Sequence, residues 1–331
     1  MKQFFIQRWF LIALTVVLAV GIVFAPRIQY ISNMKTLRYG IVSAVLFLMA
    51  FPLEASAIAR TISRPGAALL ACVINFGFIP PFAFLLSKIL QVDMGAGLLV
   101  AATTPCTLAS AAVWTRRAGG NDSIALLVTL ITNGLCFLIT PTWLYVFGQV
   151  SQRLENVDTD VISPAEMIAK LGLLVVLPMA LAQLLRSYGP LGKWATKNKL
   201  PMSVAAQCGI LSMVFMGAIR TGLNIYDGES PIWSDWVMMV TAVMVVHLAA
   251  LWIGFSIAKA VGFVRADCIA VGISGSQKTL MVGLQVALES GLSALPIVCY
   301  HVGQLVLDTL IVDRWRRQDE KAGKSLPKAG E

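Results

Sequence analysis

Ten long apolar segments constrain the fold of this chain more than any other feature. A membrane-spanning helix needs about 20 mostly apolar residues. Segments near that length occur at 4–24, 38–54, 66–89, 95–115, 121–147, 167–187, 201–221, 233–260, 266–288 and 293–314. Soluble domains carry about 25% charged residues, whereas this chain carries 13% and is 57% hydrophobic. The sequence therefore predicts an all-α polytopic membrane protein with ten transmembrane helices.

The basic residues predict the orientation of these spans. Ten spans place both termini on one face, and 18 of the 26 Lys and Arg residues fall on that face against six on the other. The remaining two, Lys170 and Lys278, lie inside spans. Because basic loops stay in the cytoplasm, we expect an inner- or plasma-membrane protein with cytoplasmic termini. The net charge of +9 then reflects orientation and contact with membrane lipid, not a nucleic-acid partner.

A long polar stretch at 148–166 divides the spans into two sets of five. An odd number of spans gives the two halves opposite orientations, as in inverted-repeat transporters. We expect a first inverted repeat at 1–147 and a linker loop at 148–166. A second repeat at 167–314 and a solvated, mobile cytoplasmic tail at 315–331 follow.

The fourth and ninth spans are interrupted at matching positions in the two halves. They read GLLVAATTPCTLASAAVW at 97–114 and CIAVGISGSQKTLMVGLQVA at 268–287. The interrupting residues are Thr103, Thr104, Pro105, Thr107 and Ser110 in one, and Ser274, Gly275, Ser276, Gln277 and Thr279 in the other. Small residues also serve tight helix packing. Paired interruptions nevertheless indicate a binding site near the midplane, where half-helix N-termini favour anions.

Lys278 is a cation in the middle of an otherwise apolar segment, and ionisable residues inside a membrane are functional by default. Two structural alternatives remain open. The side chain could reach an interface, although about ten residues separate it from either end of the span. It could also form a fixed ion pair with Asp308, which shares a helical face with His301 and Gln304. We expect His247, in the apolar run MVVHLAALW, to be structural.

Three motifs in this order carry a resemblance to a known family. They are TTPCTLASAAVWTRRAGGN at 103–121, GSQKTLMVGLQVA at 275–287 and LPIVCYHVGQLVL at 295–307. Over nearly its whole length the chain resembles the bile acid:sodium symporter family, and its SBF-like branch more closely. The resemblance implies panel and core bundles, with the fourth and ninth spans broken and crossing at the centre. It also implies alternating access and sodium-coupled uptake of organic anions.

The sodium ligands implied by the resemblance are only partly present. Aligning the family's glutamine with Gln277 places Ile273 where a carboxylate is expected. Alanines at positions 111 and 125 replace an asparagine and a hydroxyl. The ligands that remain, if a sodium ion is bound, are Asn75, Ser110, Thr129 and Gln277. Sodium prefers hard oxygen ligands, anionic ones included, so the lost acid and the added Lys278 argue against sodium coupling.

We hypothesise that the Lys278 ammonium takes the place of a bound sodium ion, reaching Asn75, Gln277, Thr279 or nearby carbonyl groups. It would then stay charged and attract the substrate anion, or release a proton during the cycle.

The sequence as a whole predicts a symporter-like secondary active transporter for a small organic anion. No HExxH, GxSxG or P-loop motif suggests an enzyme, and no cofactor is expected besides the sodium ion in question. The rival is a non-transporting membrane regulator or partner-binding protein on the same fold. The candidate substrate- or ion-binding residues are Asn75, Thr103, Thr104, Thr107, Ser110, Thr129, Asn133, Ser274, Ser276, Gln277, Lys278, Thr279, His301, Gln304 and Asp308.

Overall fold

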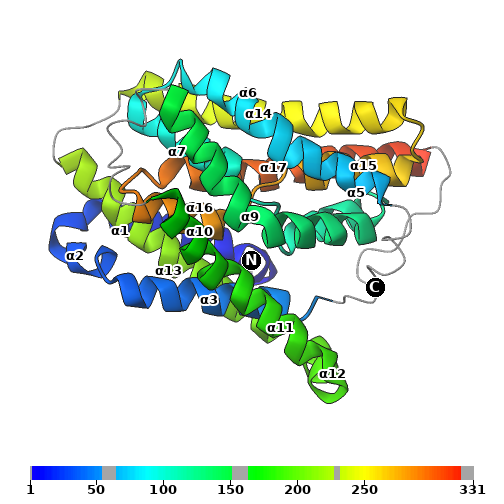
Figure 1. Ribbon diagram of the computed structural model, residues 1–331, viewed down its shortest axis with the longest axis horizontal. Helices are drawn as coiled ribbons and strands as arrows, with labels where there is room; N and C mark the ends of the chain where they lie inside the picture. The colour runs from blue at the N-terminus through cyan, green and yellow to red at the C-terminus, as the bar shows by residue number, and fades with distance from the viewer. Residues whose placement is uncertain (1, 54–64, 151–162, 227–231, 322–331) are drawn as a thin grey trace.

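A computed structural model describes residues 2–53, 65–150, 163–226 and 232–321, and its regular elements there are all helical. Figure 1 shows the longer helices packed side by side along the long axis of the molecule. Six of them are long and apolar enough to cross a membrane: Gly66–Ser87, Asp122–Val150, Pro164–Ser187, Lys199–Tyr226, Trp233–Ala260 and Leu295–Gln318. A bent pair, Ile12–Val23 and Ala25–Ser32, forms a seventh candidate with an angle of 107° between its parts.

The first half of the chain contains one wide break, between Thr103 and Ser110. Its elements are α1 (Lys2–Val23), α2 (Ala25–Ser32), α3 (Lys35–Ala50), α5 (Gly66–Val73), the π-helical turn η1 (Ile74–Phe78), α6 (Ile79–Ser87), α7 (Val92–Thr103), α8 (Ser110–Arg117) and α9 (Asp122–Val150).

The second half contains a shorter break, between Ser276 and Leu280. Its elements are α10 (Pro164–Leu171), the π-helical turn η3 (Gly172–Val176), α11 (Leu177–Ser187), α12 (Gly189–Lys197), α13 (Lys199–Tyr226), α14 (Trp233–Ala260), α15 (Arg265–Ser276), α16 (Leu280–Glu289) and α17 (Leu295–Lys321).

Each of the ten predicted segments overlaps helical structure, but several boundaries differ. The second segment, 38–54, corresponds to α3, which ends at Ala50, and residue 54 lies outside the described ranges. Residues 189–197, expected in a loop, form the helix α12. The tail was predicted to be mobile from 315, whereas α17 continues to Lys321 and buries Trp315 to 6% exposure. Residues 151–162 of the linker and 322–331 of the tail lie outside the described ranges.

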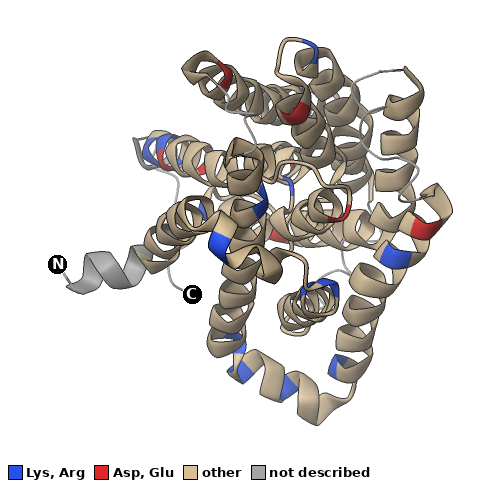
Figure 2. Cartoon of the chain, turned by 90° about the vertical axis from the view of Figure 1, so that its left-hand side faces the viewer, with Lys and Arg blue, Asp and Glu red and all other residues tan. Residues whose placement is uncertain are grey.

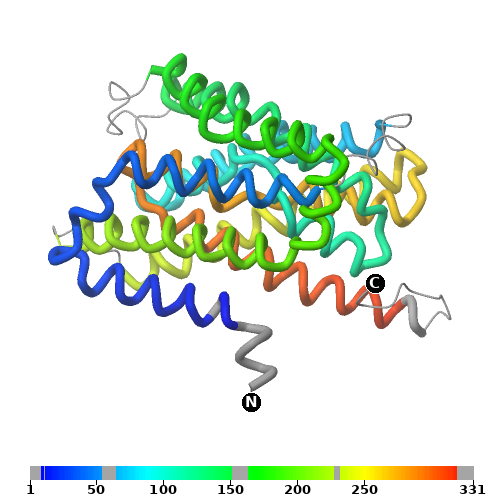
Figure 3. Tube along the Cα trace, turned by 90° about the horizontal axis from the view of Figure 1, so that it is seen from below, coloured from blue at the N-terminus to red at the C-terminus, as the bar shows by residue number. Residues whose placement is uncertain are grey.

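The helices pack in two groups. In one group α13 packs against α1, α2 and α3, and α3 also contacts α11. Figure 3 shows α1, α13 and α3 side by side on the face turned towards the viewer. In the other group α15 packs against α5, α8, α9 and α14, and α17 contacts α7 and α14. Contacts of α16 with α3 and α13 join the two groups.

The predicted interruptions are real breaks in the helices. Helix α7 ends at Thr103 and α8 begins at Ser110, while α15 ends at Ser276 and α16 begins at Leu280. The two breaks lie against each other, because the Thr279 amide donates to the Pro105 carbonyl oxygen at 2.8 Å. Two glycines allow α17 to pack close to the broken spans. A Cβ atom at Gly97 would lie 2.7 Å from Pro296, and one at Gly283 would lie 2.7 Å from Ile297.

Candidate functional site

Lys278 lies in the break between α15 and α16, and neutral oxygen atoms surround its ammonium group. Nζ donates to the Asn75 carbonyl oxygen at 2.7 Å, to Asn75 Oδ1 at 3.0 Å and to the Thr104 carbonyl oxygen at 2.8 Å. These three acceptors match the three donors of an ammonium group. The ring of Phe76 lies 5.5 Å away, which adds a cation–π contact. With 2% exposure, the side chain does not reach an interface.

Asn75 positions both the cation and the break that carries it. It lies in the π-helical turn η1, and its Nδ2 donates to the carbonyl oxygens of Gly275 at 3.1 Å and Gln277 at 2.9 Å. Its Oδ1 and carbonyl oxygen then remain for Lys278. π-Helical turns are rare and occur frequently at functional sites.

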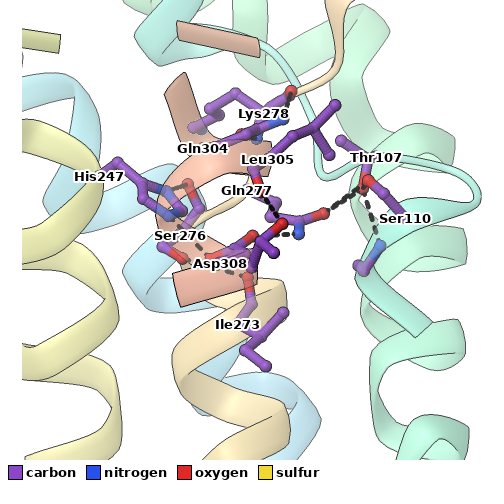
Figure 4. Close-up of polar contacts among 12 residues, drawn as sticks. Thr107, Ser110, His247, Ile273, Ser276, Gln277, Lys278, Gln304, Leu305 and Asp308 are labelled. Carbon is purple, nitrogen blue, oxygen red and sulfur yellow. Dashed lines mark hydrogen bonds and ion pairs between the residues drawn. The ribbon is translucent and has the colours of Figure 1, made fainter. Parts of the chain in front are cut away.

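Gln277 connects the two breaks through its side chain, as Figure 4 shows. Its Oε1 accepts hydrogen bonds from Thr107 Oγ1 at 2.5 Å and Ser110 Oγ at 2.9 Å. Its Nε2 donates to Asp308 Oδ2 at 2.6 Å. Residue 273, where the family resemblance places a carboxylate, is a fully buried isoleucine. The acid bonded to Gln277 is instead supplied by Asp308 on α17.

Asp308 pairs with His247 and not with Lys278, so the fixed Lys278–Asp308 pair considered from the sequence is not what the structure contains. His247 Nε2 lies 3.0 Å from Asp308 Oδ1, and both side chains are almost completely buried. His247 Nδ1 lies 3.3 Å from the Ser276 carbonyl oxygen. His247 was not among the predicted site residues, although an ionisable residue inside an apolar run was the signal that could have included it.

Side chains from neighbouring helices satisfy the backbone groups that both breaks expose. Gln304 accepts from the Lys278 amide at 2.8 Å and donates to the Lys278 carbonyl oxygen at 2.9 Å. Asn133 donates to the Cys106 carbonyl oxygen at 2.9 Å, and the hydroxyl of Thr129 donates to the Thr107 carbonyl oxygen at 3.1 Å. A bilayer interior offers no water for such groups, so these side chains make the breaks possible.

Several other predicted site residues do not direct their polar atoms to this centre. The hydroxyls of Thr103, Thr104, Ser274 and Ser276 donate to carbonyl oxygens three or four residues earlier. Thr279 contributes its backbone amide to the contact with Pro105. His301 is half-buried and lies beside Gln304, with Nδ1 3.0 Å from Gln304 Nε2. The centre therefore consists of Asn75, Thr107, Ser110, Gln277, Lys278, Gln304 and Asp308, with His247 added.

The oxygen atoms expected to bind sodium are engaged elsewhere. Asn75 Oδ1 accepts from Lys278, and Gln277 Oε1 accepts from two hydroxyls. The Thr129 hydroxyl donates to the backbone of the first break. An ammonium group lies among them, and like charges repel strongly at low dielectric. This donor set fits the Lys278 ammonium and does not fit a sodium ion beside it.

Comparisons with known proteins agree with the resemblance seen in the motifs. The model of the SBF-like CPA transporter family matches residues 8–317. Sodium/bile acid cotransporter 7-A of Xenopus laevis is 23% identical over 342 residues, covering 96% of this chain and 95% of that protein. A protein of Escherichia coli (strain K12) named "Putative symporter YfeH" is 24% identical over 334 residues, covering 97% and 96%.

The family match, the relatives named as cotransporter and symporter, and the apolar helices support one another. The expectation of an integral membrane protein that resembles the bile acid:sodium symporters is therefore confirmed. The chain belongs to the SBF-like CPA transporter family.

Proposed function

We propose that this protein is a secondary active transporter of a small organic anion, in which the Lys278 ammonium takes the place of a sodium ion. The observation that carries the proposal is the coordination of Nζ by three neutral oxygens at 2.7–3.0 Å. A cation held in this way keeps its charge available, since a carboxylate partner is not among its contacts.

The charges around the place where the α7–α8 and α15–α16 breaks meet, called the crossing point from here on, support an anionic substrate. Asp308, an acid in contact with Gln277, faces His247 at 3.0 Å, so its charge is directed to a different partner. The positive end of the α16 dipole adds to the Lys278 charge, because α16 begins two residues after the lysine. An acidic group entering the centre would meet a buried cation and a helix N-terminus.

The same coordination supports a cycle that does not depend on sodium. A sodium ion binds reversibly and stabilises the protein by mass action, whereas the ammonium is part of the chain. The names of the two relatives, a sodium/bile acid cotransporter and a symporter, are the basis for the class of substrate proposed here and not for the coupling ion.

The remaining features of the proposal concern architecture. Ten spans in two inverted five-helix repeats, with cytoplasmic termini, fit the 18-to-6 distribution of basic residues. The two packing groups correspond to a panel and a core that rock against each other in alternating access. The two breaks, each served by amide and hydroxyl side chains, would form the substrate site between them.

The test compares sodium with choline in two measurements on wild type, Lys278→Ala and Lys278→Met. For the purified wild-type protein in detergent, thermal stability should be the same in sodium as in choline. Both variants should be less stable, and Lys278→Ala, which leaves room for an ion, should respond to millimolar sodium more than Lys278→Met. Uptake of organic anions into proteoliposomes should proceed for wild type in choline alone. Stabilisation of wild type by millimolar sodium would reject the replacement and require a new ligand set.

The alternative is a non-transporting regulator or partner-binding protein on this fold. It predicts no uptake of any organic anion under either salt. It also predicts that a bound partner protects loops or the tail, and not the crossing point, from chemical labelling. Polar side chains at the two breaks favour transport, because a scaffold has no need of them.

A further inference from the structure

A second group of charged side chains surrounds Glu289, the last residue of α16. Its carboxylate accepts hydrogen bonds from Arg38 Nη2 at 2.5 Å and Lys170 Nζ at 2.8 Å. Tyr39 donates its hydroxyl to the same carboxylate at 2.9–3.0 Å, and Gln285 Nε2 approaches at 3.4 Å. These residues could not be grouped from the sequence, because 119 to 251 positions separate Arg38, Tyr39 and Lys170 from Glu289.

The group connects three helices and, through α16, the crossing point. Arg38 and Tyr39 come from α3 and Lys170 from α10, whereas Glu289 ends the half-helix that begins next to the lysine-bearing break. Figure 3 shows α3 in blue running alongside the orange segment that contains α16. A helix of ten residues is about 15 Å long. Events at Glu289 and at Lys278 therefore act on opposite ends of one short helix.

The group has more positive than negative charge, and one buried donor remains unused. Two cations face one carboxylate, and the exposed fractions of Arg38 and Glu289 are only 3% and 8%. Arg38 Nε, a donor, and Gln285 Oε1, an acceptor, are buried and have no hydrogen-bond partner. Lys170 is 38% exposed, so one side of the group is open. Figure 2 shows how sparse Lys, Arg, Asp and Glu are among the tan helices, which makes such a concentration unusual in this chain.

We propose that Arg38 and Lys170 form a binding site for the acidic group of an organic anion, and that the Glu289 carboxylate occupies this site in the present conformation. The proposal rests on the proposed function, since the ligand is the substrate approaching the crossing point. The planar Arg38 guanidinium and the Tyr39 hydroxyl provide directional donors, and Lys170 provides a point charge. An arriving carboxylate competes with Glu289, and its binding releases α16 from α3 and α10.

Glu289 competes with anions from solution for the two cations, so the site can be tested by removing the Glu289 charge. Glu289 is tethered, so its effective concentration at the cations is in the mM range or above. Small anions should therefore bind wild type weakly. Glu289→Gln removes the competing charge, keeps the side-chain shape and leaves both cations uncompensated. It should expose the site to anions from solution.

The experiment measures thermal stability of the purified protein in detergent with choline acetate as the probe. Choline chloride at equal ionic strength and neutral acetamide are the reference solutes. Glu289→Gln should bind acetate at least tenfold more tightly than wild type. Adding Lys170→Gln to that variant should remove most of the gain. Adding Lys35→Gln, a matched change at an exposed lysine on the same helix as Arg38, should leave the gain intact.

Acetate affinity equal in Glu289→Gln and wild type would overturn the proposal. So would equal losses from the Lys170 and Lys35 changes, because that result indicates a general charge effect. If Glu289→Gln does not fold, Glu289→Asp shortens the competing side chain by one methylene and should give a smaller gain. No gain in that variant is again a rejection. Binding is measured without transport, so a positive result with no anion uptake would reject the proposed function and leave this site standing.

Discussion

His247 Nε2 lies 3.0 Å from Asp308 Oδ1, while the other ring nitrogen faces the Ser276 carbonyl oxygen at 3.3 Å. Both nitrogens of one imidazole therefore face oxygen atoms. A proton on Nε2 can donate to Asp308 Oδ1, whereas a proton on Nδ1 can donate to the Ser276 carbonyl oxygen. The imidazole therefore connects α17 to the last residue of α15.

The first prediction concerns Asp308. Asp308→Asn should lower the free energy of unfolding by less than about 2 kcal/mol. The amide oxygen can accept from Gln277, and the amide nitrogen can donate to an unprotonated His247 Nε2. Asp308→Leu should cost about 3–5 kcal/mol, because it leaves buried polar partners unpaired. Chemical unfolding in detergent measures both values. Equal losses would mean that the Asp308 carboxyl group itself, and not the hydrogen-bond pattern, stabilises the centre.

Asn75→Asp separates the charge of Lys278 from its coordination. The substitution keeps the acceptor at Oδ1 and places a carboxylate 3.0 Å from Nζ, which neutralises the cation. It also removes the donor to the Gly275 and Gln277 carbonyl oxygens, at a cost of about 1–3 kcal/mol. Anion uptake should fall at least tenfold in the folded variant. Asn75→Ser, which keeps the site uncharged, is the control and should lose less uptake.

The Gln304 side chain should matter far more than that of another buried glutamine. Gln304→Met leaves the Lys278 amide and carbonyl oxygen without partners and should cost about 2–5 kcal/mol. Gln285→Met removes one long contact of 3.4 Å and should cost less than about 1 kcal/mol. Unfolding midpoints of the two variants give the comparison. Similar losses would show that the break finds other partners.

Gly97 and Gly134 provide a matched pair for testing the close packing of α17. A Cβ atom at Gly97 would lie 2.7 Å from Pro296 Cγ and 3.0 Å from the Ser293 carbonyl oxygen, whereas one at Gly134 meets nothing within 4 Å. Gly97→Ala should therefore destabilise by about 1–3 kcal/mol. Gly134→Ala should be neutral or stabilise by up to about 1 kcal/mol. Thermal unfolding of both variants measures the difference. If Gly97→Ala leaves the stability unchanged, α17 lies further from α7 than in this structure.

The proposed orientation is tested by cysteine labelling in intact cells. In a Cys208→Ser background, which removes an exposed native thiol, Lys35→Cys should react with an impermeant reagent added outside. Lys193→Cys should react only after the membrane is permeabilised. Both positions are exposed in the structure, so reversed accessibility would contradict cytoplasmic termini.

Local sequence features predicted the helices and their breaks because each depends on neighbouring residues. Pro105 and the glycine and hydroxyl residues around Gln277 end helices wherever they stand, and the apolar runs define the spans. Asn75 was identified through the family resemblance, and in the structure its Oδ1 accepts a hydrogen bond from Lys278 Nζ.

Partners across the bundle could not be predicted in the same way. The spacing on α17 placed Asp308, Gln304 and His301 on one helical face, but spacing does not say which residue of another helix meets each. In the structure Asp308 contacts His247 and Gln277 instead of Lys278. Arg38, Lys170 and Glu289 each look ordinary alone, and only tertiary packing brings them together.

The coordination of Lys278 has a consequence for the conditions under which the protein works. A bound ion is present in a fraction of molecules that depends on its concentration, whereas a covalently attached ammonium is present once in every chain. The arrangement of Asn75 and Thr104 around Nζ would then be the same at low and at high sodium concentration. Under the proposed function, no sodium gradient contributes to the driving force, and net movement of the anion follows the gradients of the solutes that the protein itself carries.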